Sequence, residues 1–173
     1  FVMAVGMFQK KVTILDAAAV WAVCWLGNLT GSILLAGMYT LTGLCSGSVE
    51  MLLAETTLTK MTVAPVEVFM RAVLCNILVC LAVWCGMKMK SESGKLIMVF
   101  WCLITFFTAG FEHSVANMST MMIGLMNPGQ CDLGISGYVY NLAVATIGNM
   151  AGGILFMAVP YFLIAKEKVT GKH

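Results

Sequence analysis

The chain has 173 residues, of which 60% are hydrophobic and only 10% are charged, whereas a soluble domain carries about 25% charged residues. Together with a mean hydropathy of +0.93, this composition excludes an ordinary soluble domain and predicts a set of membrane spans. The net charge of +2 is too small to indicate nucleic-acid binding, and two histidines with no C-x-x-C pair among seven cysteines predict neither a metal site nor a cofactor.

Apolar runs predict four membrane spans after a short apolar stub at 1–8. In chain order the spans cover residues 17–43, 66–87, 96–126 and 135–165. A mixed segment, 44–65, follows the first span, and a turn-rich segment, NPGQCDLG at 127–134, precedes the last. Because the chain opens on apolar residues without a start signal, we expect a helix that begins upstream of residue 1, and the inverted repeat described below implies about one and a half further spans there.

The lysines predict the orientation of these spans. If the spans alternate in direction, only Lys60 and Arg71 fall on one side of the membrane. Eight lysines fall on the other: Lys10, Lys11, Lys88, Lys90, Lys95, Lys166, Lys168 and Lys172. By the positive-inside rule, the lysine-rich side and the C-terminus are cytoplasmic, and the 44–65 and 127–134 loops are external. We therefore expect a multi-pass protein of the inner or plasma membrane.

A repeated motif predicts internal symmetry. The first span contains GNLTGS at 27–32, with Asn28, and the last contains GNMAGG at 148–153, with Asn149. Both read G-N-x-x-G, and small residues at this spacing let helices pack closely in lipid. The two spans enter the membrane from opposite sides, which is typical of an inverted repeat. The predicted fold class is an all-α membrane protein built as an inverted repeat.

The span at 96–126 is too long for one straight helix. At 1.5 Å per residue its 31 residues would exceed the hydrocarbon layer of about 30 Å. The stretch TAGFEHSVANM at 108–118 carries polar residues at its centre, so we expect a break near 110–114. Ser114 or Asn117 could cap the second half-helix, whose positive end would favour an anion.

Two ionisable residues, Glu112 and His113, lie at the predicted break. Ionisable groups are costly in lipid and usually face a pathway, so His113 is interpreted as a pore residue rather than a structural histidine. Glu112 would repel an anion and is interpreted as structural, paired with backbone donors or a distant cation. Lys60 is either a solvated loop lysine or a cation at a pore mouth that attracts anions.

Other residues have two open interpretations. Phe106 and Phe107 could form a hydrophobic constriction or pack in the core. The intramembrane amides of Asn28, Asn76 and Asn149 could join helices by hydrogen bonds or face a lumen.

Three motifs together resemble the formate/nitrite transporter family: FEHSVANM at 111–118, the two G-N-x-x-G spans, and VCLAVW at 79–84. The resemblance covers the whole chain, and the overall string is most similar to the hydrosulfide-channel branch. It implies an aquaporin-like inverted repeat of six transmembrane segments, the second and fifth broken. It also implies a homopentamer in which each protomer has its own pore.

The resemblance also implies residue roles. The central histidine corresponds to His113, the lysine of the external loop to Lys60, and the constriction phenylalanine to Phe106. A cytoplasmic-side constriction residue corresponds to Val79, and pore-lining asparagines correspond to Asn76 and Asn149. The family's first broken helix, with a threonine that faces the histidine, would lie upstream of residue 1.

These features predict a channel for a small monovalent anion of a weak acid. Hydrosulfide is the first choice, and a formate or nitrite channel or proton-coupled transporter is the alternative. A neutral-solute channel of aquaporin type is disfavoured by Lys60, by the ionisable centre and by the lack of paired N-P-A motifs. An enzyme using His113 and a cysteine is disfavoured because no cysteine has a recognisable partner. The expected partners are small anions and the lipid bilayer, and no nucleic acid.

Overall fold

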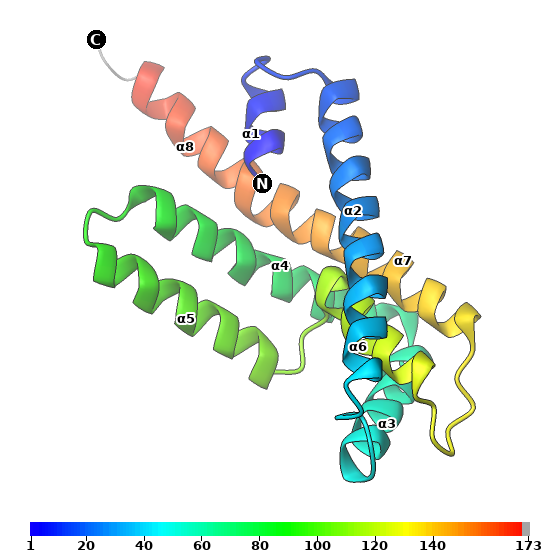
Figure 1. Ribbon diagram of the computed structural model, residues 1–173. Coiled ribbons are helices and arrows are strands. Elements are labelled where there is room, and N and C mark those ends of the chain that lie inside the picture. The colour runs from blue at the N-terminus through cyan, green and yellow to red at the C-terminus, as the bar shows by residue number, and fades with distance from the viewer. Residues whose placement is uncertain (171–173) are drawn as a thin grey trace.

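The computed structural model describes residues 1–170, with side chains through residue 165, and within that range every regular element is a helix. The expected all-α fold is therefore confirmed. In chain order (Figure 1) the elements are α1 (Val2–Phe8), α2 (Ile14–Leu41), α3 (Ser48–Thr62), α4 (Pro65–Lys88), α5 (Glu92–Thr108), α6 (Ser114–Met126), α7 (Ile135–Ala151), the π-helix η1 (Gly152–Ala158) and α8 (Val159–Thr170).

Three helices of the described chain are long and apolar enough to cross a membrane: α2, α4, and the helix that runs without interruption from α7 through η1 into α8. Figure 1 shows α4 and α5 side by side and antiparallel, while the long C-terminal helix runs past α4 and α2 crosses α6. Because many of the apolar side chains on these helices are exposed, a lipid or protein environment must cover them.

The predicted broken span is confirmed as two half-helices, α5 and α6, separated by residues 109–113. The halves have different neighbours. α5 packs on α4, whereas α6 packs on α2, α3 and α7. The two ends of the break differ: residues 109 and 110 are exposed, whereas Glu112 is buried and the N–H of Ser114 is bonded to Asn149 of α7.

The segment 44–65, expected to be an external loop, is mostly the helix α3. The helix begins after Gly47, whose φ of +59° suits glycine, and it buries Ala54 and Thr57. Thr57 packs directly against Gly124 of α6, where a β-carbon would collide with the Thr57 side chain. The mixed polarity of this segment is thus that of a short helix lying on α6, which the sequence alone does not distinguish from a polar loop.

The second G-N-x-x-G motif explains the packing of α7 on α4. A β-carbon at Gly148 would lie 2.7 Å from both the Ala72 β-carbon and the Phe69 carbonyl oxygen, and one at Gly152 would collide with the Val73 carbonyl. These glycines let two helix backbones approach closely, as expected for small residues in lipid. In the first motif, by contrast, a β-carbon at Gly27 or Gly31 would meet nothing within 4 Å among the described residues.

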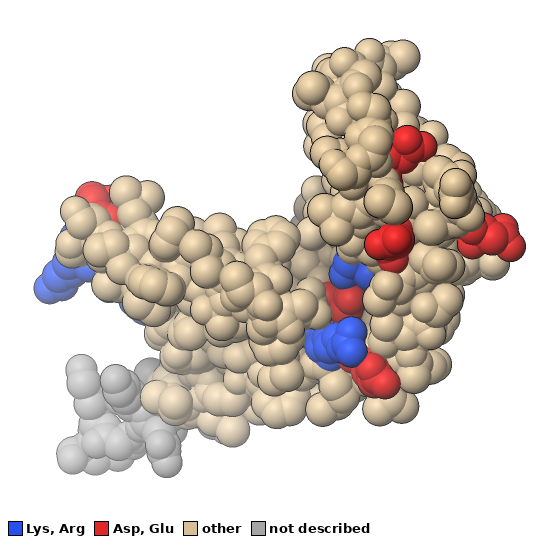
Figure 2. All heavy atoms as spheres, turned by 90° about the horizontal axis from the view of Figure 1, so that it is seen from below, with Lys and Arg blue, Asp and Glu red and all other residues tan. Residues whose placement is uncertain are grey.

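Charged side chains are few, and on the face seen in Figure 2 they gather at two places. Figure 2 shows one group at the end of the α4–α5 pair, where Lys88, Lys90 and Lys95 lie in sequence, and a second among the helices that surround α3. The surface between them carries no charged side chains over most of this view. Three lysines used to predict the orientation, Lys166, Lys168 and Lys172, lie outside the described side chains.

Candidate functional site

A glycine turn holds the break between α5 and α6. The chain leaves α5 at Gly110, whose φ of +69° lies in the left-handed region. The N–H of Gly110 donates to the carbonyl of Phe107 (3.2 Å), and the N–H of Phe111 donates to the carbonyl of Phe106 (3.0 Å). These paired bonds form a Schellman motif, which satisfies the last carbonyls of α5. The turn thereby leaves residues 111–113 outside both helices.

His113 caps the second half-helix with its own ring. It is the N-cap of α6, and its Nδ1 accepts a hydrogen bond from the N–H of Ala116 at 3.3 Å. Because Nδ1 is the acceptor, a neutral ring carries its hydrogen on Nε2, which remains a donor. The ring is half-buried and stacks on Phe106, with centroids 5.7 Å apart at 28°. The predicted caps were Ser114 and Asn117, and the histidine takes that position instead.

Glu112 is paired with a distant cation, which was one of the two predicted arrangements. The residue is 2% exposed, and its carboxylate accepts hydrogen bonds from the Lys60 ammonium at 2.9 Å through both oxygens. Lys60 lies in the last turn of α3, 52 residues earlier, with 19% of its side chain exposed. The pair is electrically neutral, so neither residue presents an uncompensated charge at the break.

Two buried amides join this ion pair to α6 and α7. The Nδ2 of Asn117 donates both to Glu112 and to the Oδ1 of Asn141, the latter at 2.8 Å. The Nδ2 of Asn141 then donates to the backbone carbonyl of Lys60 at 3.0 Å. The network closes on itself across α3, the break, α6 and α7, so every charged group in it has a partner. Asn141 is a site residue that the sequence reasoning missed, although an amide in an apolar span was the signal that could have found it.

Asn149 binds the backbone on both sides of His113. Its Oδ1 accepts from the N–H of Ser114 at 2.9 Å, and its Nδ2 donates to the carbonyls of Glu112 (2.9 Å) and Ala72 (2.8 Å). Asn76 of α4 in turn donates to the backbone carbonyl of Asn149. The second G-N-x-x-G motif therefore places its asparagine directly against the break.

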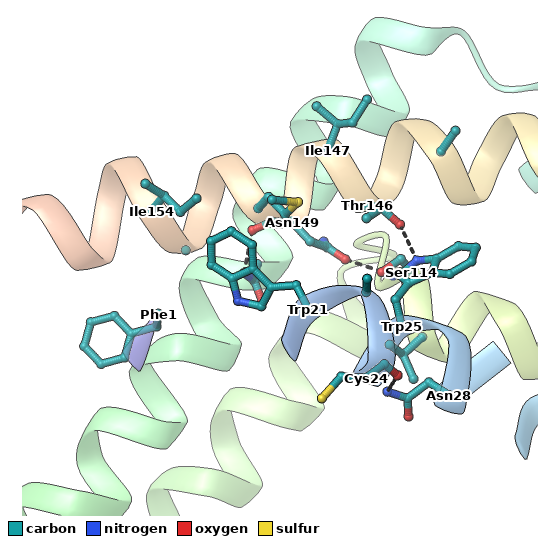
Figure 3. Close-up of a pocket in the computed structure, with 16 residues that line it drawn as sticks. Phe1, Trp21, Cys24, Trp25, Asn28, Ser114, Thr146, Ile147, Asn149 and Ile154 are labelled. Atoms are coloured by element: carbon teal, nitrogen blue, oxygen red, sulfur yellow. Dashed lines mark hydrogen bonds between the residues drawn. The ribbon is translucent and has the colours of Figure 1, made fainter. Parts of the chain in front are cut away.

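A cavity of about 590 Å³ adjoins the break (Figure 3). It lies among α2, α6, α7 and η1, and its lining is mostly apolar. Trp25 of α2 closes one side by donating from Nε1 to the Oγ1 of Thr146 at 3.1 Å. Four of the predicted residues contribute to the lining: Asn28, Asn76, Ser114 and Asn149. The indole of Trp21 and the Trp25–Thr146 pair were not singled out from sequence.

The remaining predicted residues lie outside the lining of this cavity. His113, Phe106, Glu112, Asn117 and Lys60 surround the break, and Val79 is a half-buried residue of α4. Phe106 is buried and stacks on both Phe107 and His113, so it packs as a core residue here and also lies against the histidine. The Asn28 side chain donates to the Cys24 carbonyl of its own helix (2.8 Å), its one hydrogen bond within the part of the chain that the structure describes.

Known families and proteins give an independent comparison. A family model described as formate/nitrite transporter matches residues 1–163. The chain is similar to the uncharacterized transporter YwcJ of Bacillus subtilis strain 168, with 37% identity over 161 residues, which is 92% of this chain and 63% of that protein. It is also similar to the nitrite transporter NirC of Escherichia coli K12, with 33% identity over 159 residues, covering 90% of this chain and 59% of NirC.

Two solved structures have the same fold. One, an FNT family ion channel, superposes with a TM-score of 0.86 at 30% identity and covers 93% of this chain and 65% of that chain. The other, a pentameric formate channel with formate bound, gives a TM-score of 0.73 at 28% identity and covers 84% of this chain and 65% of that one. The chain thus spans less than two thirds of the length of each of these proteins.

Proposed function

Because the chain belongs to the formate/nitrite transporter family, we propose that the full-length protein is a membrane channel for small monovalent anions of weak acids, with hydrosulfide as the principal cargo. The observation that supports this most is the position of His113 at the break of a membrane-depth helix, with Nε2 left as a donor. The choice of hydrosulfide as the cargo rests on overall sequence similarity alone. Formate and nitrite are the alternatives, because they are the anions in the names of similar proteins.

The break offers an anion two favourable groups. The N-terminal end of a helix such as α6 carries roughly half a positive charge, which favours anions. An imidazole N–H beside it can donate a hydrogen bond, or a proton, to a weak-acid anion. Both lie where an anion has lost hydration, a loss that costs at least several kcal/mol and that these groups would offset.

The ion pair beside the break prevents the charge of Glu112 from repelling anions. An unpaired carboxylate at Glu112 would repel the cargo, but Lys60 compensates its charge within 2.9 Å. We therefore assign Lys60 a role in neutralising Glu112, in addition to the expected attraction of anions toward the pore. Asn117 and Asn141 keep the pair in place.

Hydrophobic residues would select the form of the cargo that crosses. Phe106, stacked against His113, would disfavour a bare anion more than its neutral conjugate acid. Val79 of α4 would form a second constriction toward the cytoplasmic side. Asn76, with one amide hydrogen not used in its bond to the Asn149 carbonyl, could contact the cargo in the adjoining cavity.

The assembly and orientation belong to the same proposal. The full-length protein would form a homopentamer with one pore per protomer, in line with the structural neighbour that is itself a pentameric formate channel. Its lysine-rich loops and C-terminus would face the cytoplasm across the inner or plasma membrane.

The proposal is tested by flux in proteoliposomes that contain the purified full-length protein. Hydrosulfide, formate, nitrite and chloride are compared with urea, which serves as a neutral solute of similar size. Fastest flux for hydrosulfide supports the proposal in full. Fastest flux for formate or nitrite retains the channel and replaces the cargo, and flux of urea without any weak-acid anion would contradict the proposal.

A further inference from the structure

The amide of Asn149 has no hydrogen left for an anion. An asparagine side chain offers two N–H donors and one acceptor oxygen. Both donors are occupied, by the carbonyls of Ala72 and Glu112, and the oxygen accepts from the N–H of Ser114. Asn149 is 8% exposed, so water cannot readily replace these bonds. Donation to a passing anion would leave a buried backbone carbonyl without a partner, which costs about 1–3 kcal/mol.

The two backbone groups of the break that bond to Asn149 lie immediately before and after His113. The carbonyl of Glu112 precedes the histidine, and the N–H of Ser114 follows it. Neither group has a partner within a helix, because the first N–H groups of α6 and the backbone between the half-helices lack one. At membrane depth such groups must be satisfied by neighbouring side chains. One side chain does this for both, and it is tied to α4 through the Ala72 carbonyl.

The glycines of the motif allow Asn149 to reach both α4 and the break. Gly148 and Gly152 allow α4 to approach so closely that a β-carbon at either position would collide with its backbone. The Ala72 carbonyl then lies within 2.8 Å of the Asn149 amide. The G-N-x-x-G motif of α7 therefore combines two functions, close packing on α4 and a hydrogen-bonding clamp on the break.

We infer that Asn149 is a positioning residue that fixes the orientation of His113, rather than a donor to the transported anion. This inference rests on the proposed function for its consequence in transport. The family resemblance implies instead that Asn149 lines the pore and contacts the anion. A positioning role predicts that the loss of Asn149 changes transport through its effect on His113. Asn28 provides a matched control, since it occupies the same motif position in α2 and lines the same cavity, but among the described residues its side chain bonds within its own helix and not to the break.

The first test measures the NMR signals of the His113 ring and does not require a transport assay. The chain has two histidines, His113 and His173, so full-length protein labelled with 15N-histidine and carrying His173→Ala isolates the His113 ring signals, apart from any histidine upstream of residue 1. Those signals are followed through a pH titration in detergent for wild type, Asn149→Ala and Asn28→Ala. Asn149→Ala is expected to change the His113 ring signals and their pH dependence, and Asn28→Ala is expected to leave both in place. Unchanged His113 signals in folded Asn149→Ala would overturn the inference.

The second test is a double-mutant cycle in flux. Asn149→Ala is expected to lower anion flux roughly tenfold in the wild-type background and to have no further effect in the His113→Ala background, because the two residues act as one unit. Losses that multiply in the double variant would show that Asn149 acts on the anion independently, and would refute the positioning role. If no anion passes through the wild type while the His113 signals still respond to Asn149→Ala, the proposed function fails and the clamp stands.

A third measurement begins with wild-type protein, so that its first result does not depend on a variant being folded. In wild-type protein, hydrogen exchange of the Ser114 amide is expected to be slow, because Asn149 accepts its hydrogen. Asn149→Ser, which keeps one small polar group, serves as the milder variant and is expected to speed that exchange. Fast exchange of the Ser114 amide in the wild type would contradict the clamp directly.

Discussion

At the residue scale, the Lys60–Glu112 pair is the charged contact on which the geometry of the break depends. Both carboxylate oxygens of Glu112 accept from the Lys60 ammonium, and Asn117 donates to the same carboxylate. Removing one member leaves the other charge without its partner at a site where Glu112 is almost fully buried. Removing both leaves two neutral side chains of similar size, which is far less costly.

We therefore expect Lys60→Met and Glu112→Gln each to destabilise the protein by roughly 2–4 kcal/mol, somewhat below the range for a fully buried pair because 19% of the Lys60 side chain is exposed. The double variant is expected to recover a large part of that loss. Thermal unfolding of the three variants in detergent measures the effect. Additive losses in the double variant would show that the two charges do not stabilise one another.

Two cysteines outside the spans should differ in reactivity. Cys45, between α2 and α3, is only 9% exposed, whereas Cys131 in the 127–134 segment is half-buried. Burial first, and the negative charge of Glu50 second, raise the pKa of the Cys45 thiol above its ordinary value. Because only the thiolate reacts, a raised pKa lowers the reactive fraction at neutral pH.

A membrane-impermeant maleimide added outside cells at pH of about 7 is therefore expected to label Cys131 at least about tenfold faster than Cys45. The rate at Cys45 should continue to rise with pH beyond the point where an ordinary thiol has fully ionised. Single-cysteine variants followed by mass spectrometry give both rates. Labelling of Cys131 only after the membrane is permeabilised would contradict the predicted external position of this segment.

At the element scale, the two copies of the G-N-x-x-G motif have different surroundings. Gly148 lies under α4, where a β-carbon would approach the Phe69 carbonyl and Ala72 at 2.7 Å. The equivalent residue of α2, Gly27, has open space on that side within the described chain. In the described chain, the same substitution should therefore be tolerated at Gly27 and costly at Gly148.

Gly148→Ala is expected to destabilise the protein by about 1–3 kcal/mol, because backbone atoms must move to admit the methyl group. Gly27→Ala removes a glycine from the middle of a helix and is expected to be neutral or to stabilise by up to about 1 kcal/mol. The thermal midpoints of the two variants in detergent provide the comparison. A loss at Gly27 as large as the loss at Gly148 would mean that another helix covers α2 in the full-length protein.

The broken span also shows how far sequence reasoning can reach. Excess length, together with polar residues at the centre of 96–126, predicted the break correctly, because both are local properties. The identity of the cap was wrong, since a histidine ring seldom takes this role and its choice depends on the chain direction set by the Gly110 turn. The helix α3 was not predicted because its mixed polarity matches both a loop and a helix packed on α6.

Contacts between distant segments were the least predictable part of the site. Nothing local to Glu112 indicates that its partner is Lys60, and the network through Asn141 joins α3 to α7 over 81 residues. The role of Asn149 likewise depends on how closely α4 and α7 approach, which follows from Gly148 and Gly152 only after the helices are paired. Sequence periodicity identifies elements, whereas these pairings are properties of the folded chain.

At the scale of the whole molecule, the chain combines an apolar exterior with one compact polar centre. Charged residues are 10% of the sequence, yet an ion pair and four buried or half-buried asparagines converge on the break between α5 and α6. In a membrane such a concentration of polar groups is costly and is a functional site by default. The central claim is that His113, fixed at this break, controls the passage of anions.

The most direct test compares wild type with His113→Ala and His113→Phe in proteoliposomes, using full-length protein and the best-transported anion at pH values of about 5.5 and 7.5. We expect both variants to reduce flux by roughly 10- to 100-fold, because a donor to a desolvated anion is lost, and to abolish the difference between the two pH values. If His113→Phe left both the flux and its pH dependence unchanged, the histidine would be a structural cap of α6, and the account of the site as an anion pathway would be wrong.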